Sequence, residues 1–155
     1  MTNDSKHAYV AALKLLGRRE LSEAQVRQRL ARREHHPDAI DAAVARLLDE
    51  RAIDDTRVAE AIARTETAIR RRGRLRILRK IESAGIAPAT AKRAVDAVFE
   101  DLEPGELLEA ALHKRLRGRD HIADKAEFAR LYRYLMGQGF ESDRVLALLR
   151  KHRTP

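Results

Sequence analysis

The fold is decided by the stretch at residues 22–50, SEAQVRQRLARREHHPDAIDAAVARLLDE, whose apolar pattern recurs twice further along the chain. A shift of 51 positions places it on a matching stretch, and a further shift of 54 does so again. The matched apolar sets are Val26, Leu30, Ala43, Val44, Leu47 and Leu48 on Ile77, Ile81, Ala94, Val95, Val98 and Phe99, and then Ile77, Ile81, Ile86, Ala91, Ala94 and Val95 on Leu131, Leu135, Phe140, Val145, Leu148 and Leu149. Pro37 also falls on Pro88, and Gly85 falls on Gly139. A fixed period of about 50 residues predicts a repeat architecture.

Each copy has the features of helices joined by short turns. Apolar residues recur three or four positions apart, which is the spacing of one helix face. Ser22 followed by Gln25 predicts a capping box, Pro37 predicts a first helical turn, and Gly85 predicts a left-handed helix end. The predicted helices begin near residues 7, 22, 37, 54, 88, 104, 124 and 142, with a further helix between residues 73 and 85.

Two helices carry more specific expectations. Val10, Leu13 and Leu16 are expected to form the inner face of the first helix. The fourth helix is expected to be long, with Ile69 turned inward and a break at Gly73.

The helices follow the order three, three and three, so the sequence predicts an all-α fold of three tandem three-helix repeats, nine helices in all. No segment alternates with period two over a useful length, so no sheet is expected. The predicted repeats are residues 1–53, 54–103 and 104–155. Each is too small to bury a sufficient core alone, so each is expected to pack against its neighbour.

Composition indicates a highly charged surface. Charged residues make up 36% of the 155 residues, and the net charge is +8, with 25 arginines against 7 lysines. A basic balance favours nucleic acid, an acidic protein or an anionic lipid as partner, although an Arg-rich genome would give the same excess. Cysteine is absent, the first residues lack a signal-peptide core, and no apolar run approaches the roughly 18 residues of a membrane span. A cytoplasmic protein is expected.

Candidate catalytic and metal-binding residues are few. His35 and His36 are adjacent, a spacing that does not direct both rings at one ion, so we interpret them as solvated turn residues. Asp54 and Asp55 with Glu60 resemble an acidic cluster, but capping of the fourth helix explains the aspartates more simply. Phosphate-binding glycine loops and a nucleophile elbow are missing. No enzyme activity, cofactor or metal is expected.

The strongest functional signal is the run at residues 64–80, with eight basic residues against the single acid Glu66. A solvated helix face normally interleaves acids, so this run favours an anionic partner. Guanidinium groups suit both phosphate and carboxylate, so the residues alone leave nucleic acid and acidic protein open. Within the run, Arg70, Arg72 and Arg76 are expected to be exposed. The predicted partner-binding residues are Arg18, Arg19, Arg64, Arg70, Arg71, Arg72, Arg74, Arg76, Arg79, Lys80, Lys114, Arg115 and Arg117.

Weaker basic patches occupy the corresponding places in the outer repeats. They include Arg27, Arg29, Arg32 and Arg33 in the first repeat and Arg119, Arg130 and Arg133 in the third. If the repeats stack, these patches line one continuous surface, an arrangement typical of solenoids.

Several short motifs resemble those of the RecX family of recombination regulators. The opening motif is LLGRRELS at residues 15–22, followed by Val26 and Leu30; the others are Asp54-Asp55 with Val58-Ala59, Arg72-Gly73 through Arg76-Ile77 to Gly85-Ile86, Lys114-Arg115, and Gly139-Phe140. The resemblance spans about residues 8–150. The chain departs from the family pattern at Val58, at Leu75, at Gln138, and at residues 34–35, where a Gly-apolar turn is usual.

The resemblance implies a nine-helix, elongated, curved, solenoid-like protein that binds the RecA recombinase filament on DNA. It implies lower ATP hydrolysis, strand exchange and repressor cleavage by RecA, and therefore a role in DNA repair, recombination and the SOS response. It also implies that catalytic residues are absent. A non-specific DNA-binding protein acting through its Arg-rich face is the alternative, and a helical scaffold for an acidic protein is a third hypothesis. In each case a monomer is expected.

Overall fold

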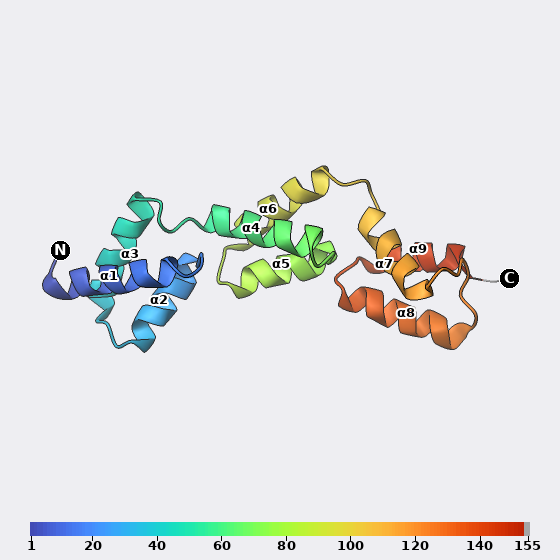
Figure 1. The fold of residues 1–155 in the computed structure, drawn as a ribbon, viewed down its shortest axis with the longest axis horizontal. Coiled ribbons are helices and arrows are strands. Elements are labelled where there is room, and N and C mark those ends of the chain that lie inside the picture. The colour runs from blue at the N-terminus through green and yellow to red at the C-terminus, as the bar shows by residue number, and fades with distance from the viewer. Residues whose placement is uncertain (154–155) are drawn as a thin grey trace.

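The computed structural model describes residues 1–153, which form nine α-helices and no strand. The helices are α1 (Asn3–Leu16), α2 (Glu23–Arg32), α3 (Pro37–Asp49), α4 (Asp55–Ala68), α5 (Arg74–Ser83), α6 (Pro88–Glu100), α7 (Glu106–Leu116), α8 (Lys125–Gly137) and α9 (Ser142–Lys151). The all-α prediction is therefore confirmed. Figure 1 shows the helices as three successive groups of three in an elongated row, with the two chain ends at opposite ends.

Each group of three helices has its own hydrophobic core. Val26, Leu30 and Leu47 lie in the core of α1–α3, whereas Ile77 and Ile81 lie in that of α4–α6. The core of α7–α9 contains Leu108, Leu112, Leu116, Leu131, Leu135, Val145 and Leu149. The boundaries at residues 53 and 103 stay a prediction, and residues 154–155 of the predicted third repeat lie outside the described residues.

Helix starts follow the local signals of the sequence. Ser22 and Gln25 form a complete capping box at α2, and the side chains of Asp54 and Asp124 accept hydrogen bonds from the first turns of α4 and α8. Pro37 and Pro88 open α3 and α6, at the position where a missing N–H costs nothing. These expectations are confirmed.

The expectations for the fourth and seventh helices are wrong. The fourth helix ends at Ala68, and Ile69 is 76% exposed, because the chain leaves the helix through hydrogen bonds back to Thr65 and Glu66. The seventh helix begins at Glu106, after Gly105 in a left-handed conformation.

The first helix also buries a different face from the one expected. Val10 and Leu13 are 47% and 40% exposed, whereas Ala8, Ala12 and Leu15 are buried. The two alanines turn toward the core because a small side chain lets the backbone of α1 lie close to its neighbour α3.

The turn between α2 and α3 has the same geometry as its glycine-containing equivalents. Gly85 and Gly139 have φ angles of 78° and 98°, and Glu34 takes the equivalent place with φ of 64°. The N–H of Glu34 donates to Ala31, three residues back, as the N–H of Gly139 donates to Met136. The first group therefore keeps the repeat's turn without its glycine, at the cost of a left-handed non-glycine residue.

We predict that Glu34→Gly stabilises the protein. Glycine removes the left-handed strain, and the exposed Glu34 side chain makes no hydrogen bond within residues 1–153, so the gain should be about 0.5–1 kcal/mol after the added chain entropy. Urea unfolding followed by circular dichroism measures it. Glu34→Ala is the matched control, because it removes the same charge but keeps a Cβ at positive φ. Equal stabilisation by both variants would contradict the strain explanation.

Candidate partner-binding surface

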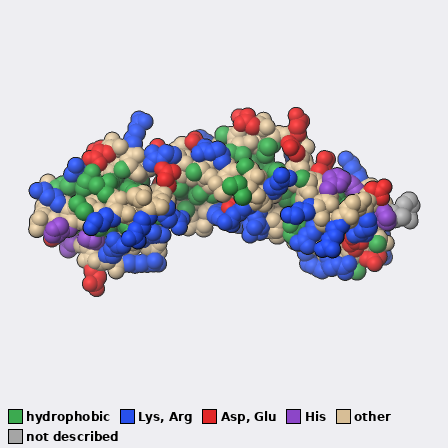
Figure 2. Space-filling model, viewed as in Figure 1, with side chains coloured by type: hydrophobic (Ala, Val, Ile, Leu, Met, Phe, Trp, Pro, Cys, Tyr) green, Lys and Arg blue, Asp and Glu red, His purple; other side chains and the backbone are tan. Residues whose placement is uncertain are grey.

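Basic side chains follow the second helix of each group along one side of the molecule. Helices α2, α5 and α8 each carry three or four Lys or Arg residues and a single acid. These helices lie along the lower side of Figure 1, and Figure 2 shows many Lys and Arg side chains on that side, with a few acidic side chains at its two ends. The lower outline is concave between the first and third groups. The basic helices of the three groups therefore lie on the same side of the molecule, and the continuous basic surface stays a prediction.

The second and third groups meet through backbone contact. The N–H groups of Gly73 and Leu75 donate to the carbonyls of Gln138 (2.8 Å) and Gly139 (2.9 Å). A Cβ on Gly73 would lie 2.5 Å from backbone atoms of Gly139 and Phe140, so only glycine allows this approach. The family-like motif around residue 73 thus builds a junction between groups.

Two arginines of the 64–80 run belong to this junction. Arg72 donates from Nη1 to Oε1 of Gln138 (2.7 Å), and Arg76 donates from Nη1 to the carbonyl of Gly137 (3.1 Å). Both side chains are half-buried. The expectation that Arg70, Arg72 and Arg76 are all exposed is therefore wrong for Arg72 and Arg76, because residues far along the chain cover them.

Acids neutralise three more members of the run. Glu66 is 2% exposed, and its carboxylate pairs with Lys80 (2.8 Å) and with Arg70 (3.5 Å). Arg74 pairs with Asp96 on α6. The single acid of the run is thus buried and holds two of its cations. Arg64, Arg71 and Arg79 are exposed and make no ion pair within the described part of the chain.

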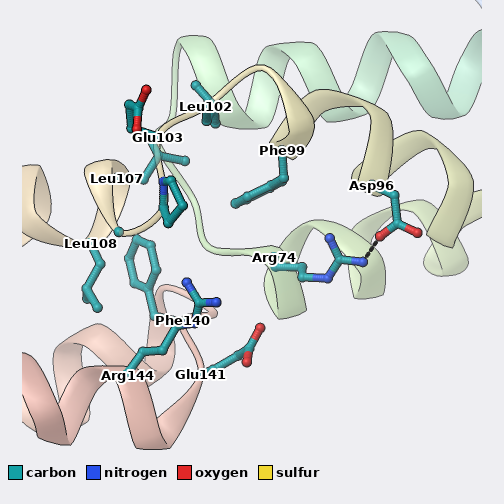
Figure 3. A pocket seen from close by; sticks show the side chains of 12 residues that line it. Arg74, Asp96, Phe99, Leu102, Glu103, Leu107, Leu108, Phe140, Glu141 and Arg144 are labelled. Carbon is teal, nitrogen blue, oxygen red and sulfur yellow. Dashed lines mark hydrogen bonds and ion pairs between the residues drawn. The ribbon is translucent and has the colours of Figure 1, made fainter.

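The Arg74–Asp96 pair borders a cavity of about 360 Å³ between the second and third groups. Figure 3 shows Phe99 beside this pair, with Phe140 and Arg144 facing them from the α9 side. The remaining walls are mostly apolar and come from the α6–α7 connection and the start of α7. The arrangement fits packing between groups, with charges at the cavity edge.

The first and second groups are joined by hydrogen bonds. The Ser22 hydroxyl donates to the carbonyl of Ala84, and the N–H of Glu23 donates to Asp55 (2.9 Å). Gly85 approaches Ala24 so closely that a Cβ there would clash. Ser22 and Asp55, predicted only as helix caps, therefore also join two groups.

The first group contains both paired and unpaired arginine side chains. Arg27 pairs with Glu23 (3.0 Å) and Asp41 (2.7 Å), and both carboxylates raise its pKa. The predicted binding residues Arg18 and Arg19, by contrast, are exposed and have no side-chain partner among residues 1–153.

In the third group, too, some basic side chains have partners and others do not. Arg115 lies over the ring of Tyr134, 3.6 Å from its centre. Arg119 pairs with Glu127, and this guanidinium is the main reason that the pKa of Glu127 falls to about 2. Lys114 and Arg117 are exposed without a partner in the described chain.

Neither a metal cluster nor a membrane-spanning helix is found in the described part of the chain. Residues 1–153 contain no group of three or more His, Cys, Asp or Glu side chains placed to hold a metal ion. No helix among them is long and apolar enough to cross a membrane. His36 instead caps α3, accepting a hydrogen bond from the N–H of Asp38 (3.1 Å).

Known proteins resemble the chain over most of its length. Residues 8–47 match the family model described as RecX, first three-helix domain. The chain is 35% identical over 138 residues to regulatory protein RecX of Halorhodospira halophila, covering 88% of this chain and 83% of the relative. It is 31% identical over 136 residues to regulatory protein RecX of Syntrophotalea carbinolica, covering 87% and 89%.

Solved structures share the fold. The crystal structure of RecX from Lactobacillus salivarius superimposes with a TM-score of 0.81 at 22% identity, covering 97% of both chains. A second crystal structure of regulatory protein RecX gives a TM-score of 0.80 at 19% identity and covers 96% of this chain. These likenesses agree with the nine-helix architecture described above.

We predict that Gly73→Ala opens the junction between the second and third groups while the helices persist. The new Cβ must displace backbone atoms, whereas the separate cores are left intact. Hydrogen exchange at the Leu75 amide should accelerate by at least tenfold, a loss of about 1.4 kcal/mol of protection. Gly137→Ala is the control, because a Cβ there meets nothing within 4 Å. Unchanged Leu75 protection in Gly73→Ala would refute the predicted opening.

Proposed function

The chain belongs to the RecX family of regulatory proteins, and we propose that it is a non-enzymatic regulator that binds the RecA recombinase filament. In this proposal it lies along several RecA subunits as a monomer in the cytoplasm. It lowers the ATPase, strand-exchange and co-protease activities of RecA, and so acts in recombination, DNA repair and the SOS response.

The observation that carries the proposal is the recurrence of basic helices on one side of a row of three groups. Helices α2, α5 and α8 repeat along the molecule in order. A filament presents the same surface at regular intervals, so linked basic groups can engage successive subunits. Linkage makes each later contact intramolecular, which raises the overall affinity well above that of one group.

Exposure and the absence of an internal contact favour some of the predicted residues for direct contact with RecA. Among residues 1–153, the predicted binding residues that are exposed and make neither an ion pair nor a cation–π contact are Arg18, Arg19, Arg64, Arg71, Arg79, Lys114 and Arg117. Arg72, Arg74 and Arg76 instead serve the junction and the Asp96 pair. We assign binding to the first set, because forming an interface with a paired cation would first require breaking its internal contact.

Purified protein should inhibit the single-strand-dependent ATP hydrolysis of RecA. ATP hydrolysis is measured at increasing molar ratios of this protein to RecA, with single-stranded DNA at a saturating concentration. Inhibition at stoichiometric or lower amounts is expected, because a chain lying across several subunits blocks more than one of them. Unchanged hydrolysis at a stoichiometric amount would contradict the proposal.

The double variant Arg64→Glu/Arg79→Glu should raise the concentration needed for half-inhibition by about tenfold. Both residues are exposed, so native circular dichroism should be kept. The control is Arg93→Glu/Arg150→Glu, which makes the same charge change at exposed positions outside the predicted binding set. Equal weakening by both variants would show that net charge alone acts.

A further inference from the structure

The turn between α4 and α5 carries the most exposed large apolar side chain of residues 1–153. Ile69, directly after α4, is 76% exposed, and Leu75, in the first turn of α5, is 40% exposed. Neither side chain belongs to the hydrophobic core of the second group. Single exposed apolar side chains are common on protein surfaces, so the surroundings of Ile69 decide whether it has a role.

The basic helices of the outer groups have no comparable side chain. Met1, Val10, Leu13 and Leu48 are the other exposed large apolar side chains of the described chain, and they lie on or beside α1 and α3. Helices α2 and α8 bury or half-bury all of their large apolar side chains. Exposed apolar surface therefore adjoins the basic surface at the second group.

Cations without an ion pair flank these two apolar side chains. Arg64 lies in the last turns of α4, and Arg71 follows Ile69 in the turn. Arg79 lies on the same face of α5 as Leu75, whose carbonyl accepts a hydrogen bond from Nε of Arg79 (3.3 Å). The core of a protein interface is depleted of charge, whereas its rim is polar. Apolar side chains bordered by cations have this composition.

The turn that carries Ile69 is held in one conformation. The N–H groups of Ile69 and Arg70 both donate to the carbonyl of Thr65, at 3.0 and 3.2 Å. Arg71 then has a φ angle of 52°, a left-handed conformation that the surrounding contacts must maintain. The N–H of Gly73 fixes the other end of the turn by donating into the third group (2.8 Å). A side chain on a fixed turn loses less conformational freedom on binding, which favours affinity.

The chemistry of Ile69 favours a protein partner over a nucleic acid strand. An aliphatic side chain gains from binding only where it meets other apolar surface, because the gain comes from releasing water. A phosphate backbone offers no such surface, and bases of single strands stack on aromatic rings, which this turn lacks. The matching surface is an apolar pocket with carboxylates at its edge.

We propose that Ile69 is the apolar anchor of the RecA contact, inserted into an apolar pocket bordered by carboxylates on one RecA subunit. Leu75 extends this contact, and the neighbouring arginines pair with the pocket edge. The inference rests on the proposed function and deepens it. The second group supplies the short-range part of binding, whereas the basic helices of the outer groups contribute mainly to long-range attraction.

The test measures binding of the full chain to RecA filaments by biolayer interferometry at several salt concentrations. The filaments are assembled on immobilised oligothymidylate with a slowly hydrolysed ATP analogue. Ile69→Ser should weaken binding about tenfold, mainly through faster dissociation. The loss should be equal at low and high salt, because no charge has changed, whereas the loss in Arg64→Glu/Arg79→Glu should shrink as salt rises. Ile69→Met keeps an apolar side chain and should bind nearly as the wild type does.

Val10→Ser is the matched control. It makes the same kind of change at a branched apolar side chain that is 47% exposed on α1, away from the basic helices, and it should bind as the wild type does. Thermal unfolding by circular dichroism verifies that each variant is folded. Wild-type affinity of Ile69→Ser, equal weakening by Val10→Ser, or a loss that disappears at high salt would each overturn the anchor.

Immobilised oligothymidylate without RecA distinguishes the two kinds of partner. The wild type and Ile69→Ser should give the same signal on this surface. If Ile69→Ser loses binding to bare DNA by the same factor as binding to the filament, Ile69 contacts DNA and the inference fails.

Inhibition of RecA ATP hydrolysis separates the anchor from the proposed function. A tenfold higher half-inhibiting concentration of Ile69→Ser is expected, in line with its weaker filament binding. If the wild type and Ile69→Ser inhibit equally, the anchor is wrong and the proposed function stands. If the wild type neither binds the filament nor inhibits hydrolysis, the proposed function is wrong, and the anchor with it.

Discussion

The close approach of two backbones at Gly73 and Gly139 is the constraint on which the arrangement of the molecule depends. The three hydrophobic cores are separate, so burial within each group does not determine how the groups are aligned. Alignment depends instead on a few hydrogen bonds, from Gly73 and Leu75 at one junction and from Ser22 and Glu23 at the other. These short polar contacts, the Arg57–Glu20 ion pair at the first junction and the apolar side chains around the cavity at the second together hold the elongated, curved shape.

Several basic side chains of the 64–80 run take part in internal contacts at or near this junction. Arg72 and Arg76 bind the turn before the last helix, and buried Glu66 binds Arg70 and Lys80. A dense basic run therefore has a structural part and a free part. The free charge is spread over all three groups and is most concentrated around the first, where five arginines surround one cleft.

The sequence predicts what local patterns determine. The repeat, the core positions of α2 and α5, and the caps at Ser22 and Asp54 follow from spacing and side-chain chemistry. The partners of the arginines do not, because Arg72 and Gln138 are 66 positions apart and no periodicity joins them. The hydropathy pattern also predicts that Leu13 is buried, whereas the structure buries Ala12 instead. Close packing between helices can favour a small side chain over a more hydrophobic one.

Repetition and charge are linked through the junctions. Several weak sites on one chain add up only if the spacing between them matches that of the partner, and the gain is lost when geometry forbids simultaneous contact. In this protein the spacing is fixed by the hydrogen bonds around Gly73 and Gly85, not by the cores. We therefore expect substitutions that misalign the groups to weaken binding to a repeating partner, as substitutions at the contact residues do. Gln138, which departs from the family pattern, holds Arg72 in the junction through the hydrogen bond from Arg72 Nη1 to its Oε1.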